Sequence, residues 1–394
     1  MKINAIINNQ KEKKENIHQP NFNLEFRIIS GRNTKVNTMK IHNYSAGPCI
    51  LPQEVFEKSA EAILNLNNSG LSLLEISHRS KDFIAIMDEA RKLALELLDL
   101  TDKGYEALFI SGGASMEFLM VPQNLMKIDG KAAYLNTGTW ANNAIEEAKL
   151  FGETVVVASS ASENYTFVPK DYNIPEDANY FHCTSNNTIF GTQMKSFPKT
   201  NIPVVCDMSS DIFSRVLDFT KFDLIYAGAQ KNMGPAGTTL VIIKTEILNK
   251  TGRKIPSILD YQKHIKAESM FNTPPVFPIY ASLLTMQWLK KQGGIAAIEK
   301  LNNAKAALLY AEIDRNPLFK GTANVEDRSV MNATFVLNDE KNAELFDKMW
   351  KAACISGLTG HRSVGGYRAS MYNALPIESV QVLVDVMEEL EENC

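Results

Sequence analysis

The sequence has 394 residues, of which 45% are hydrophobic and 22% charged, the balance of an ordinary soluble globular protein with one large domain and a smaller one. Its 41 lysines and arginines against 45 aspartates and glutamates give a formal net charge of -4, which offers no electrostatic reason to bind nucleic acid or an anionic membrane. The five cysteines are scattered and odd in number, which suits a reducing cytoplasm and argues against a disulfide framework or a metal site. No apolar run approaches the roughly 20 residues of a membrane span, and the N-terminus lacks a secretory core, so we expect a cytoplasmic protein.

Residues 1–38 are rich in asparagine and lysine and follow neither a strand nor a helix period. We interpret them as a disordered N-terminal extension that is dispensable for activity. A start codon misplaced before Met39 would also account for them. An organelle transit peptide is disfavoured, because such peptides are poor in acidic residues and Glu12, Glu15 and Glu25 lie here.

From residue 53 onward, helical patterns alternate with short apolar runs, beginning with an amphipathic helix at 82–99. Short, nearly all-apolar strands are typical of a largely parallel sheet that is buried on both faces by helices. The sequence therefore predicts an α/β fold whose large domain, residues 39–290, holds a seven-stranded sheet. Its strands are expected at 107–110, 132–135, 154–158, 180–183, 204–206, 224–226 and 239–243.

The last hundred residues have a different pattern. A long helical pattern at 281–314 is interrupted at Gly293 and Gly294, and a strand at 333–337 follows. Two further helices are expected at 340–353 and 377–391. We predict a smaller C-terminal α+β domain over residues 291–394.

The most specific chemical signal is a lysine, Lys231, that directly follows a buried strand among small residues. Glycine and alanine leave room for a bulky group against the backbone, and a desolvated lysine has a lowered pKa that makes its amine nucleophilic. This pattern suits a Schiff-base lysine. Taken alone, it would more often be a solvated lysine in a turn.

Asp207 ends the strand before that of Lys231. A carboxylate at the carboxyl edge of a parallel sheet faces the crevice where such folds bind ligands. It can keep a pyridine nitrogen protonated, as pyridoxal 5'-phosphate requires. The alternative is that Asp207 caps a following helix.

Two further elements suit the same cofactor. The turn at 111–115 contains Gly112 and Gly113 and leads into a helix expected at 116–126, so its N–H groups can hold a phosphate, although such pairs are often only turns. Trp140 follows another strand and can stack on an aromatic ring, although a core tryptophan is the ordinary alternative.

Six segments, in order, resemble the phosphoserine aminotransferases, which are fold type I, class V enzymes that depend on pyridoxal 5'-phosphate. The resemblance covers the chain from about Met39 to its end, and the last segment is the one specific to this family. The segments are NYSAGP at 43–48, EISHRS at 75–80, NTI at 187–189, IYAGAQKN at 225–232, MFNTPP at 270–275 and GHRSVGGYRAS at 360–370.

The resemblance implies a role for each site residue. Lys231 forms the Schiff base, Asp207 pairs with the ring nitrogen, Trp140 stacks on the ring and Thr188 supports the ring oxygen. The cofactor phosphate is held by Ala114, Ser115 and Gln230, with Asn272 and Thr273 of a second subunit, which implies a homodimer. The substrate is held by His361, Arg362 and Arg368, with His78 and Arg79 of that second subunit.

The implied reaction moves an amino group between L-glutamate and 3-phosphohydroxypyruvate, giving O-phospho-L-serine and 2-oxoglutarate in serine biosynthesis. A related reaction giving 4-phosphohydroxy-L-threonine, in pyridoxine biosynthesis, is implied as well. Arginine forks suit a substrate that carries both a carboxylate and a phosphate. The chain departs from some members at Ser115, where they have an arginine, and at Ala46, where they have a serine.

Three alternatives stay open at this point. Another aminotransferase or a desulfurase of the same fold would keep Lys231 and Asp207 but would not need so many cations at its substrate end. A desulfurase also needs a mobile catalytic cysteine, whereas Cys354 is expected in a helix and Cys394 is terminal. A catalytically silent binding protein would have no reason to keep Lys231.

Overall fold

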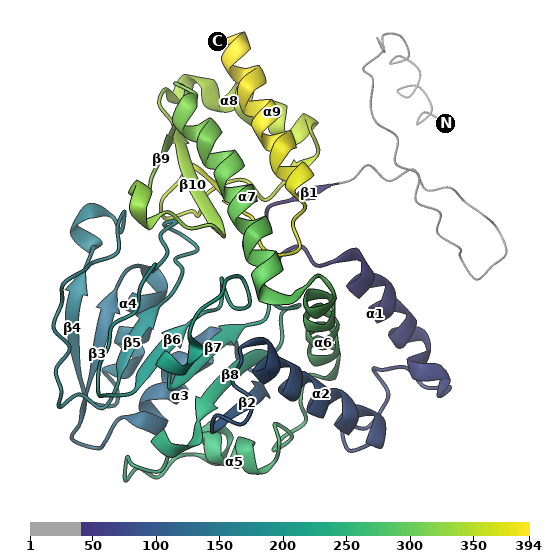
Figure 1. Ribbon diagram of the computed structural model, residues 1–394, viewed down its shortest axis with the longest axis vertical. Coiled ribbons are helices and arrows are strands. Elements are labelled where there is room, and N and C mark those ends of the chain that lie inside the picture. The colour runs from purple at the N-terminus through teal and green to yellow at the C-terminus, as the bar shows by residue number, and fades with distance from the viewer. Residues whose placement is uncertain (1–40) are drawn as a thin grey trace, which may run out of the picture. The chain divides into compact units, whose positions relative to one another are not determined.

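The computed structural model describes residues 41–394 and is built around a seven-stranded sheet in the order β2-β8-β7-β6-β5-β3-β4 (Figure 1). The strands from β7 to β4 run parallel, and β8 is antiparallel to both of its neighbours. Their bounds are β2 Tyr105–Ile110, β3 Lys131–Asn136, β4 Glu153–Ser159, β5 Phe181–Thr184, β6 Val204–Asp207, β7 Leu224–Gly228 and β8 Thr239–Lys244.

All seven predicted strands are confirmed, and each of their ends lies within two residues of the predicted position. The prediction that each is buried on both faces is wrong for β4. This strand lies at the edge of the sheet and has no buried residue, and Val156 is 44% exposed. An apolar run alone therefore does not separate an edge strand from a central one.

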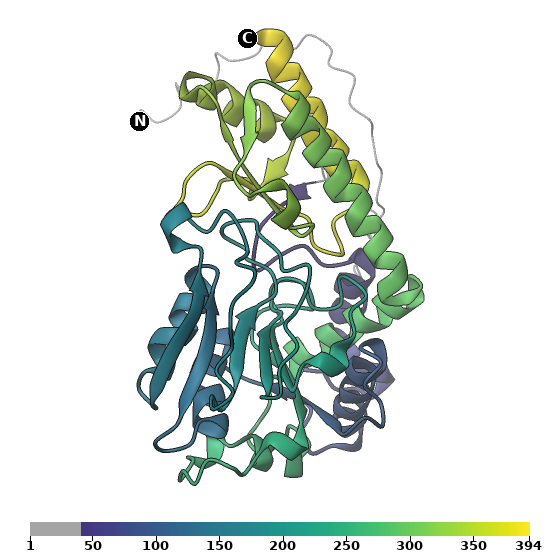
Figure 2. The same cartoon turned by 60° about the vertical axis from the view of Figure 1, so that its left-hand side comes forward.

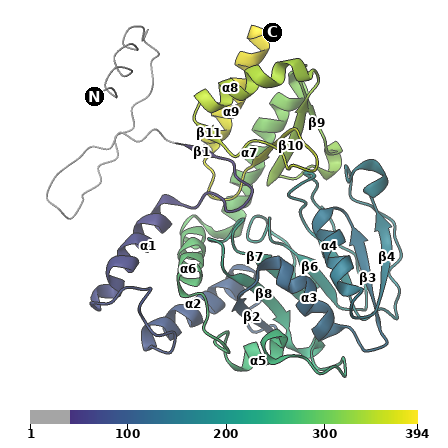
Figure 3. The same cartoon turned by 180° about the vertical axis from the view of Figure 1, so that it is seen from behind.

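Helices cover both faces of this sheet (Figures 1 and 3). Successive strand residues alternate between two cores, because strand side chains point to opposite faces. Phe109 packs into the core that contains α2 and α6, whereas Leu108 packs into the core that contains α3 and α4. The helices are α1 Gln53–Asn65, α2 Lys81–Leu97, α3 Gly113–Leu125, α4 Thr139–Ala148, α5 Tyr261–Lys266 and α6 Val276–Lys291.

A second, three-stranded antiparallel sheet has the order β12-β10-β9 and its own hydrophobic core. Helices α7 and α9 lie side by side against it (Figures 1 and 2). The chain also returns here from its other end, since β1 His42–Asn43 pairs with β11 Ile355–Ser356. The remaining elements are β9 Phe319–Gly321, β10 Asn332–Leu337, β12 Tyr367–Ser370, α7 Gly294–Arg315, α8 Ala343–Ala352 and α9 Ile377–Asn393.

The predicted helices at 82–99 and 377–391 correspond to α2 and α9, and the break at Gly293 and Gly294 separates α6 from α7. Both of these glycines have positive φ angles, 97° and 75°. The helix predicted at 340–353 begins as a 3-10 turn and ends at Ala352. Cys354 therefore lies in a turn with a φ of 59°, and its placement in a helix is wrong.

The predicted extension, residues 1–38, lies outside the described residues, and the domain boundaries at 39 and at 290 stay predictions. Among residues 41–394, no helix is both long and apolar enough to span a bilayer.

Candidate active site

The candidate site lies where parallel strands of the large sheet end. Lys231 follows β7, Asp207 is the last residue of β6, Thr188 follows β5 and Trp140 follows β3. In the sheet register Asp207 pairs with Thr184 of β5 on one side and with Tyr226 of β7 on the other. The parallel order of these strands places their carboxyl ends along one edge, so residues distant in sequence meet there.

Lys231 contacts residues that follow two other strands of this edge. Its Nζ donates a hydrogen bond of 2.9 Å to Thr188 Oγ1 and lies 5.1 Å from the centre of the Trp140 ring. Burial lowers the pKa of the Lys231 amine, and the Asp207 carboxylate acts in the opposite direction. The positive charge of Arg368 also lowers it. An amine with a lowered pKa spends more time in its nucleophilic, neutral form.

Asp207 is a buried carboxylate, 4% exposed. Its Oδ1 accepts hydrogen bonds from Ser209 N at 2.9 Å and Ser209 Oγ at 2.6 Å. Within residues 41–394, its Oδ2 accepts none. Burial raises the pKa of Asp207, whereas Lys231 and the Ser209 hydrogen bonds lower it. A turn follows β6 in place of a helix, so the interpretation of Asp207 as a helix cap is wrong.

The glycine-rich turn connects β2 to α3. Helix α3 begins at Gly113, earlier than predicted, so Ala114 and Ser115 lie in its first turn. Its N-cap, Gly112, has a φ of 115° and gives no side-chain cap, which leaves the first N–H groups of α3 available to an anion. Gln230 precedes Lys231, and its carbonyl oxygen accepts a hydrogen bond of 3.2 Å from Cys49 N.

Arg368 connects the small sheet to this site. It lies on β12, and its NH1 donates to the carbonyl oxygen of Thr188 at 3.3 Å. Burial lowers the pKa of this guanidinium, and its buried Nε has no hydrogen-bond partner in the described part of the chain. A single residue, Thr188, therefore touches both Lys231 and Arg368.

A cavity of about 690 Å³ opens beside Arg368. His361 and Lys320 line it together with Arg368, whereas no aspartate or glutamate does. Arg362 is exposed next to His361 and does not itself line the cavity. A cavity lined by cations and without carboxylates favours an anionic ligand.

Four predicted site residues are not brought to this group by the single chain. His78 and Arg79 lie in the turn before α2, and Asn272 and Thr273 lie in the exposed segment between α5 and α6. Over residues 41–394, no hydrogen bond or ion pair joins any of them to Lys231, Asp207 or Arg368. Their roles, which were assigned to a second subunit, stay predictions.

Sequence reasoning missed the polar residues that support the site. Asn186 follows β5, and Ser209, Ser210 and Asp211 follow β6, where all four are buried. The rule that identified Asp207, polar residues directly after an apolar strand, also applies to them. Asparagine, serine and aspartate after a strand are often ordinary turn residues, so this pattern alone does not indicate a site.

Comparisons with known proteins agree with this geometry. Residues 41–383 match the family model described as aminotransferase class-V. The chain is 81% identical to the phosphoserine aminotransferase of Flavobacterium psychrophilum over 353 residues, 90% of this chain and 99% of that one. It is 76% identical to that of Flavobacterium johnsoniae over the same shares of the two chains.

Solved structures give the same picture. The phosphoserine aminotransferase of Bacillus circulans subsp. alkalophilus superposes with a TM-score of 0.87 at 42% identity, over 90% of this chain and 99% of that one. A pyridoxal-phosphate-bound phosphoserine aminotransferase from Trichomonas vaginalis superposes with a TM-score of 0.84 at 36% identity, over 89% of this chain and 100% of that one. The predicted fold class is confirmed by these likenesses.

Proposed function

Because the chain belongs to the phosphoserine aminotransferases, pyridoxal-phosphate-dependent enzymes of aminotransferase class V, we propose that it interconverts 3-phosphohydroxypyruvate and O-phospho-L-serine. L-Glutamate supplies the amino group and leaves as 2-oxoglutarate. The observation that supports this proposal is that Lys231 and Arg368 both contact Thr188, so an amine and a guanidinium able to bind a carboxylate lie close together.

The residues present fit pyridoxal 5'-phosphate. Asp207 has one carboxylate oxygen without a hydrogen bond among the described residues, which can accept from a protonated ring nitrogen. The Trp140 ring lies beside the Lys231 amine, and the first turn of α3 offers uncapped N–H groups for the cofactor phosphate. When bound, this cofactor withdraws the electron pair left after removal of the α-proton of the amino acid.

Each residue of the chain has a distinct task in this proposal. Lys231 holds the cofactor through Nζ and then uses the same atom to take the α-proton, which its lowered pKa allows. Asp207 keeps the ring nitrogen charged, and Thr188 orients the Lys231 amine. Arg368 binds the α-carboxylate of each substrate.

The substrate phosphate is assigned to the loop that follows β11. His361 lines the cationic cavity and Arg362 is its neighbour, so both can reach an anion that enters beside Arg368. We further propose that His78, Arg79, Asn272 and Thr273 complete the site across a homodimer. The protein would act in the cytoplasm in serine biosynthesis, and with 4-phosphohydroxy-L-threonine in pyridoxine biosynthesis.

The proposal is tested by comparing kcat/KM for phosphoserine and serine in wild type, Arg362→Ala and Arg368→Ala. A charge-assisted hydrogen bond contributes about 1.5 to 3 kcal/mol, so loss of several phosphate contacts should lower kcat/KM for serine by about three orders of magnitude or more. Arg362→Ala should reduce activity on phosphoserine far more than on serine. Arg368→Ala should reduce both alike, because both substrates carry the α-carboxylate.

Equal use of serine and phosphoserine by wild type would replace the proposal with a general aminotransferase. The same conclusion follows if Arg362→Ala lowers both rates by one factor. A protein that binds the cofactor without any transamination would instead support the catalytically silent alternative.

A further inference from the structure

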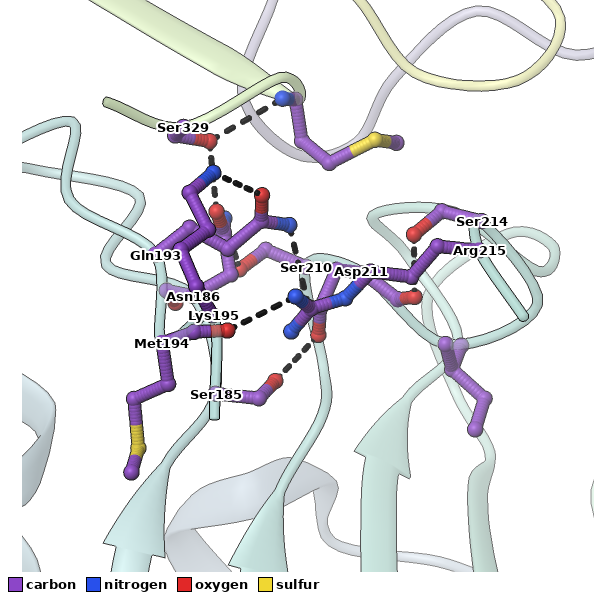
Figure 4. Close-up of polar contacts among 12 residues, drawn as sticks. Ser185, Asn186, Gln193, Met194, Lys195, Ser210, Asp211, Ser214, Arg215 and Ser329 are labelled. Atoms are coloured by element: carbon purple, nitrogen blue, oxygen red, sulfur yellow. Dashed lines mark hydrogen bonds and ion pairs between the residues drawn. The ribbon is translucent and has the colours of Figure 1, made fainter. Parts of the chain in front are cut away.

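A buried asparagine, Asn186, lies between Ser210 of the turn after β6 and Ser329 of the segment before β10 (Figure 4). It is 2% exposed and follows β5. Its Nδ2 donates to Ser210 Oγ and to Asn332 Oδ1, both at 2.8 Å, and its Oδ1 accepts from the Ser329 hydroxyl. Both amide hydrogens and the amide oxygen are therefore used in fixed directions.

Two partners of Asn186 connect it to segments that carry site residues, Ser210 directly and Asn332 through Ser370. Ser210 lies three residues after Asp207, and its hydroxyl also donates to the Asn186 carbonyl oxygen at 2.9 Å. Asn332 begins β10 and donates to Ser370 Oγ of β12 at 3.0 Å, two residues from Arg368. Thr188 follows Asn186 by two residues in the chain itself.

Backbone hydrogen bonds extend the same connection. Ser329 N donates to Gly191 O and Gln193 N to Asp327 O, both at 2.8 Å. Thr334 Oγ1 donates to Phe190 O at 3.1 Å. The loop after β5 is therefore attached along its length to the segment that leads into β10.

A buried ion pair braces the other side of this loop (Figure 4). Asp211 accepts from Arg215 NH2 at 2.9 Å and from Gln193 Nε2 at 3.3 Å, and also from the Ser185 hydroxyl. Arg215 NH1 donates to Met194 O at 2.7 Å. The Asp211 carboxylate is thus buried in an ion pair with Arg215, and its charge still raises the pKa of both Lys231 and Asp207.

We propose that Asn186 is a positioning residue that fixes Thr188, the turn after Asp207 and Arg368 relative to one another. It touches neither cofactor nor substrate. Its amide keeps the Thr188 hydroxyl under the Lys231 amine while the Thr188 carbonyl meets Arg368. The cofactor side and the carboxylate-binding side of the site are thus held at one spacing.

The inference about substrate affinity rests on the proposed function, whereas the inference about cofactor retention does not. The test uses holoenzyme carrying Asn186→Ala, with Asn316→Ala as the matched control. Asn316 is also a buried asparagine, 1% exposed, and donates to Glu312 Oε1 at 2.8 Å and Met387 O at 3.0 Å. It joins α7 to α9 and has no hydrogen bond to the site residues.

Two quantities are measured for each protein, together with its Tm. One is the rate at which the diluted holoenzyme loses pyridoxal 5'-phosphate, followed by absorbance. The other is KM for phosphoserine and for glutamate. Displacement of a site residue by about 1 Å can lower the reaction rate up to about a hundredfold. We therefore expect the smaller shift caused by Asn186→Ala to raise the cofactor release rate and both KM values about tenfold. Asn316→Ala should lower the Tm about as much as Asn186→Ala does, and it should leave the release rate and both KM values unchanged.

A release rate and KM values within twofold of wild type in a folded Asn186→Ala protein would overturn the proposal, since Asn186 would then serve stability alone. If Asn186→Ala does not fold, the cofactor release rate of Ser210→Ala tests the proposal in its place. This variant removes one partner of Asn186, and a release rate raised about threefold supports the positioning role, whereas an unchanged rate overturns it. If wild type does not act on phosphoserine, the proposed function fails, and the release rates alone still decide this inference.

Discussion

At Lys231, burial and neighbouring charges act on one amine in opposite directions. Burial and the positive charge of Arg368 lower its pKa, and the Asp207 carboxylate opposes this shift. Lys231→Ala should abolish transamination, because it removes the proposed nucleophile. It should leave a folded protein, because among residues 41–394 the side chain makes a single hydrogen bond, to Thr188. The measurements are activity with phosphoserine and 2-oxoglutarate, and the Tm.

The control for that variant is Lys244→Ala, which removes a partly exposed lysine at the end of β8 that pairs with Asp223 and Glu246. It should keep near wild-type activity, since surface ion pairs contribute about 0 to 1 kcal/mol to stability. Substantial transamination by Lys231→Ala would remove Lys231 from its assigned role.

The sequence predicted the meeting of Lys231 and Asp207 at one edge of the sheet better than the contacts that support them. Lys231 and Asp207 follow buried strands of a parallel sheet, so their meeting at one edge can be inferred without coordinates. Asn186 contacts Asn332 and Ser329, which lie in another part of the chain, before the strand predicted at 333–337. No local pattern marks such a contact.

At the scale of elements, Gly112 shows how a turn is set by backbone geometry. Its φ of 115° and an added Cβ 2.4 Å from Met116 Cβ both exclude a side chain. We expect Gly112→Ala to lower the free energy of unfolding by about 3 kcal/mol or more and to weaken cofactor retention, because the start of α3 must shift.

Gly113 gives the matched variant for this prediction. Its φ is 68°, and an added Cβ meets nothing within 4 Å. Gly113→Ala should cost only about 1 to 2 kcal/mol, the backbone penalty alone. Equal effects of the two substitutions on urea unfolding and on cofactor release would show that the Met116 contact has no influence.

Helix α7 carries a buried lysine, Lys305, which holds the chain after β12. Its Nζ donates to the carbonyl oxygens of Met371, Tyr372 and Leu375 at 3.0, 2.7 and 3.1 Å. Burial lowers the pKa of Lys305 to about 7. Below pH 7 the amine is protonated in the folded and unfolded chain alike, so this group adds no pH dependence there.

Above pH 7 the unfolded chain keeps this proton and the folded chain loses it. The contribution of Lys305 to the free energy of unfolding therefore rises with pH, by at most about 1.4 kcal/mol per unit, up to about pH 10. In urea unfolding, we expect the free energy of unfolding of wild type to increase relative to that of Lys305→Met between pH 7 and pH 9. Lys300→Met, on an exposed position of α7, should give a constant difference, and a constant difference for Lys305→Met would contradict the prediction.

Elements were predictable where a hydrophobic pattern dominates. The seven strands of the large sheet and helices α2, α6, α7 and α9 follow from apolar runs and periodicity. The short strands β9 and β12 were not predicted, because three or four residues do not define a period. The exposure of β4 could not be predicted from the sequence either. It results from the position of β4 at the edge of the sheet, and strand order is a property of the tertiary fold.

At the scale of the whole molecule, Asn272 and Thr273 make no hydrogen bond to Lys231 within residues 41–394 of a single chain. If these residues complete the site of a second subunit, two defective chains can restore each other. Subunits with Lys231→Ala would supply Asn272 and Thr273, and subunits with Asn272→Ala and Thr273→Ala would supply Lys231. One intact site then forms in each mixed dimer.

We therefore expect differently tagged versions of the two variants, co-expressed and purified through both tags, to be active when each parent alone is nearly inactive at limiting cofactor. A doubly tagged dimer should have about half the wild-type activity, because a two-fold symmetric dimer has two sites and one of them carries all the substitutions. Singly tagged parents mixed without exchange of subunits are the control and should stay inactive. An inactive doubly tagged dimer would mean that each subunit builds its site alone, and the exposed segment between α5 and α6 would then lose its assigned part in cofactor binding.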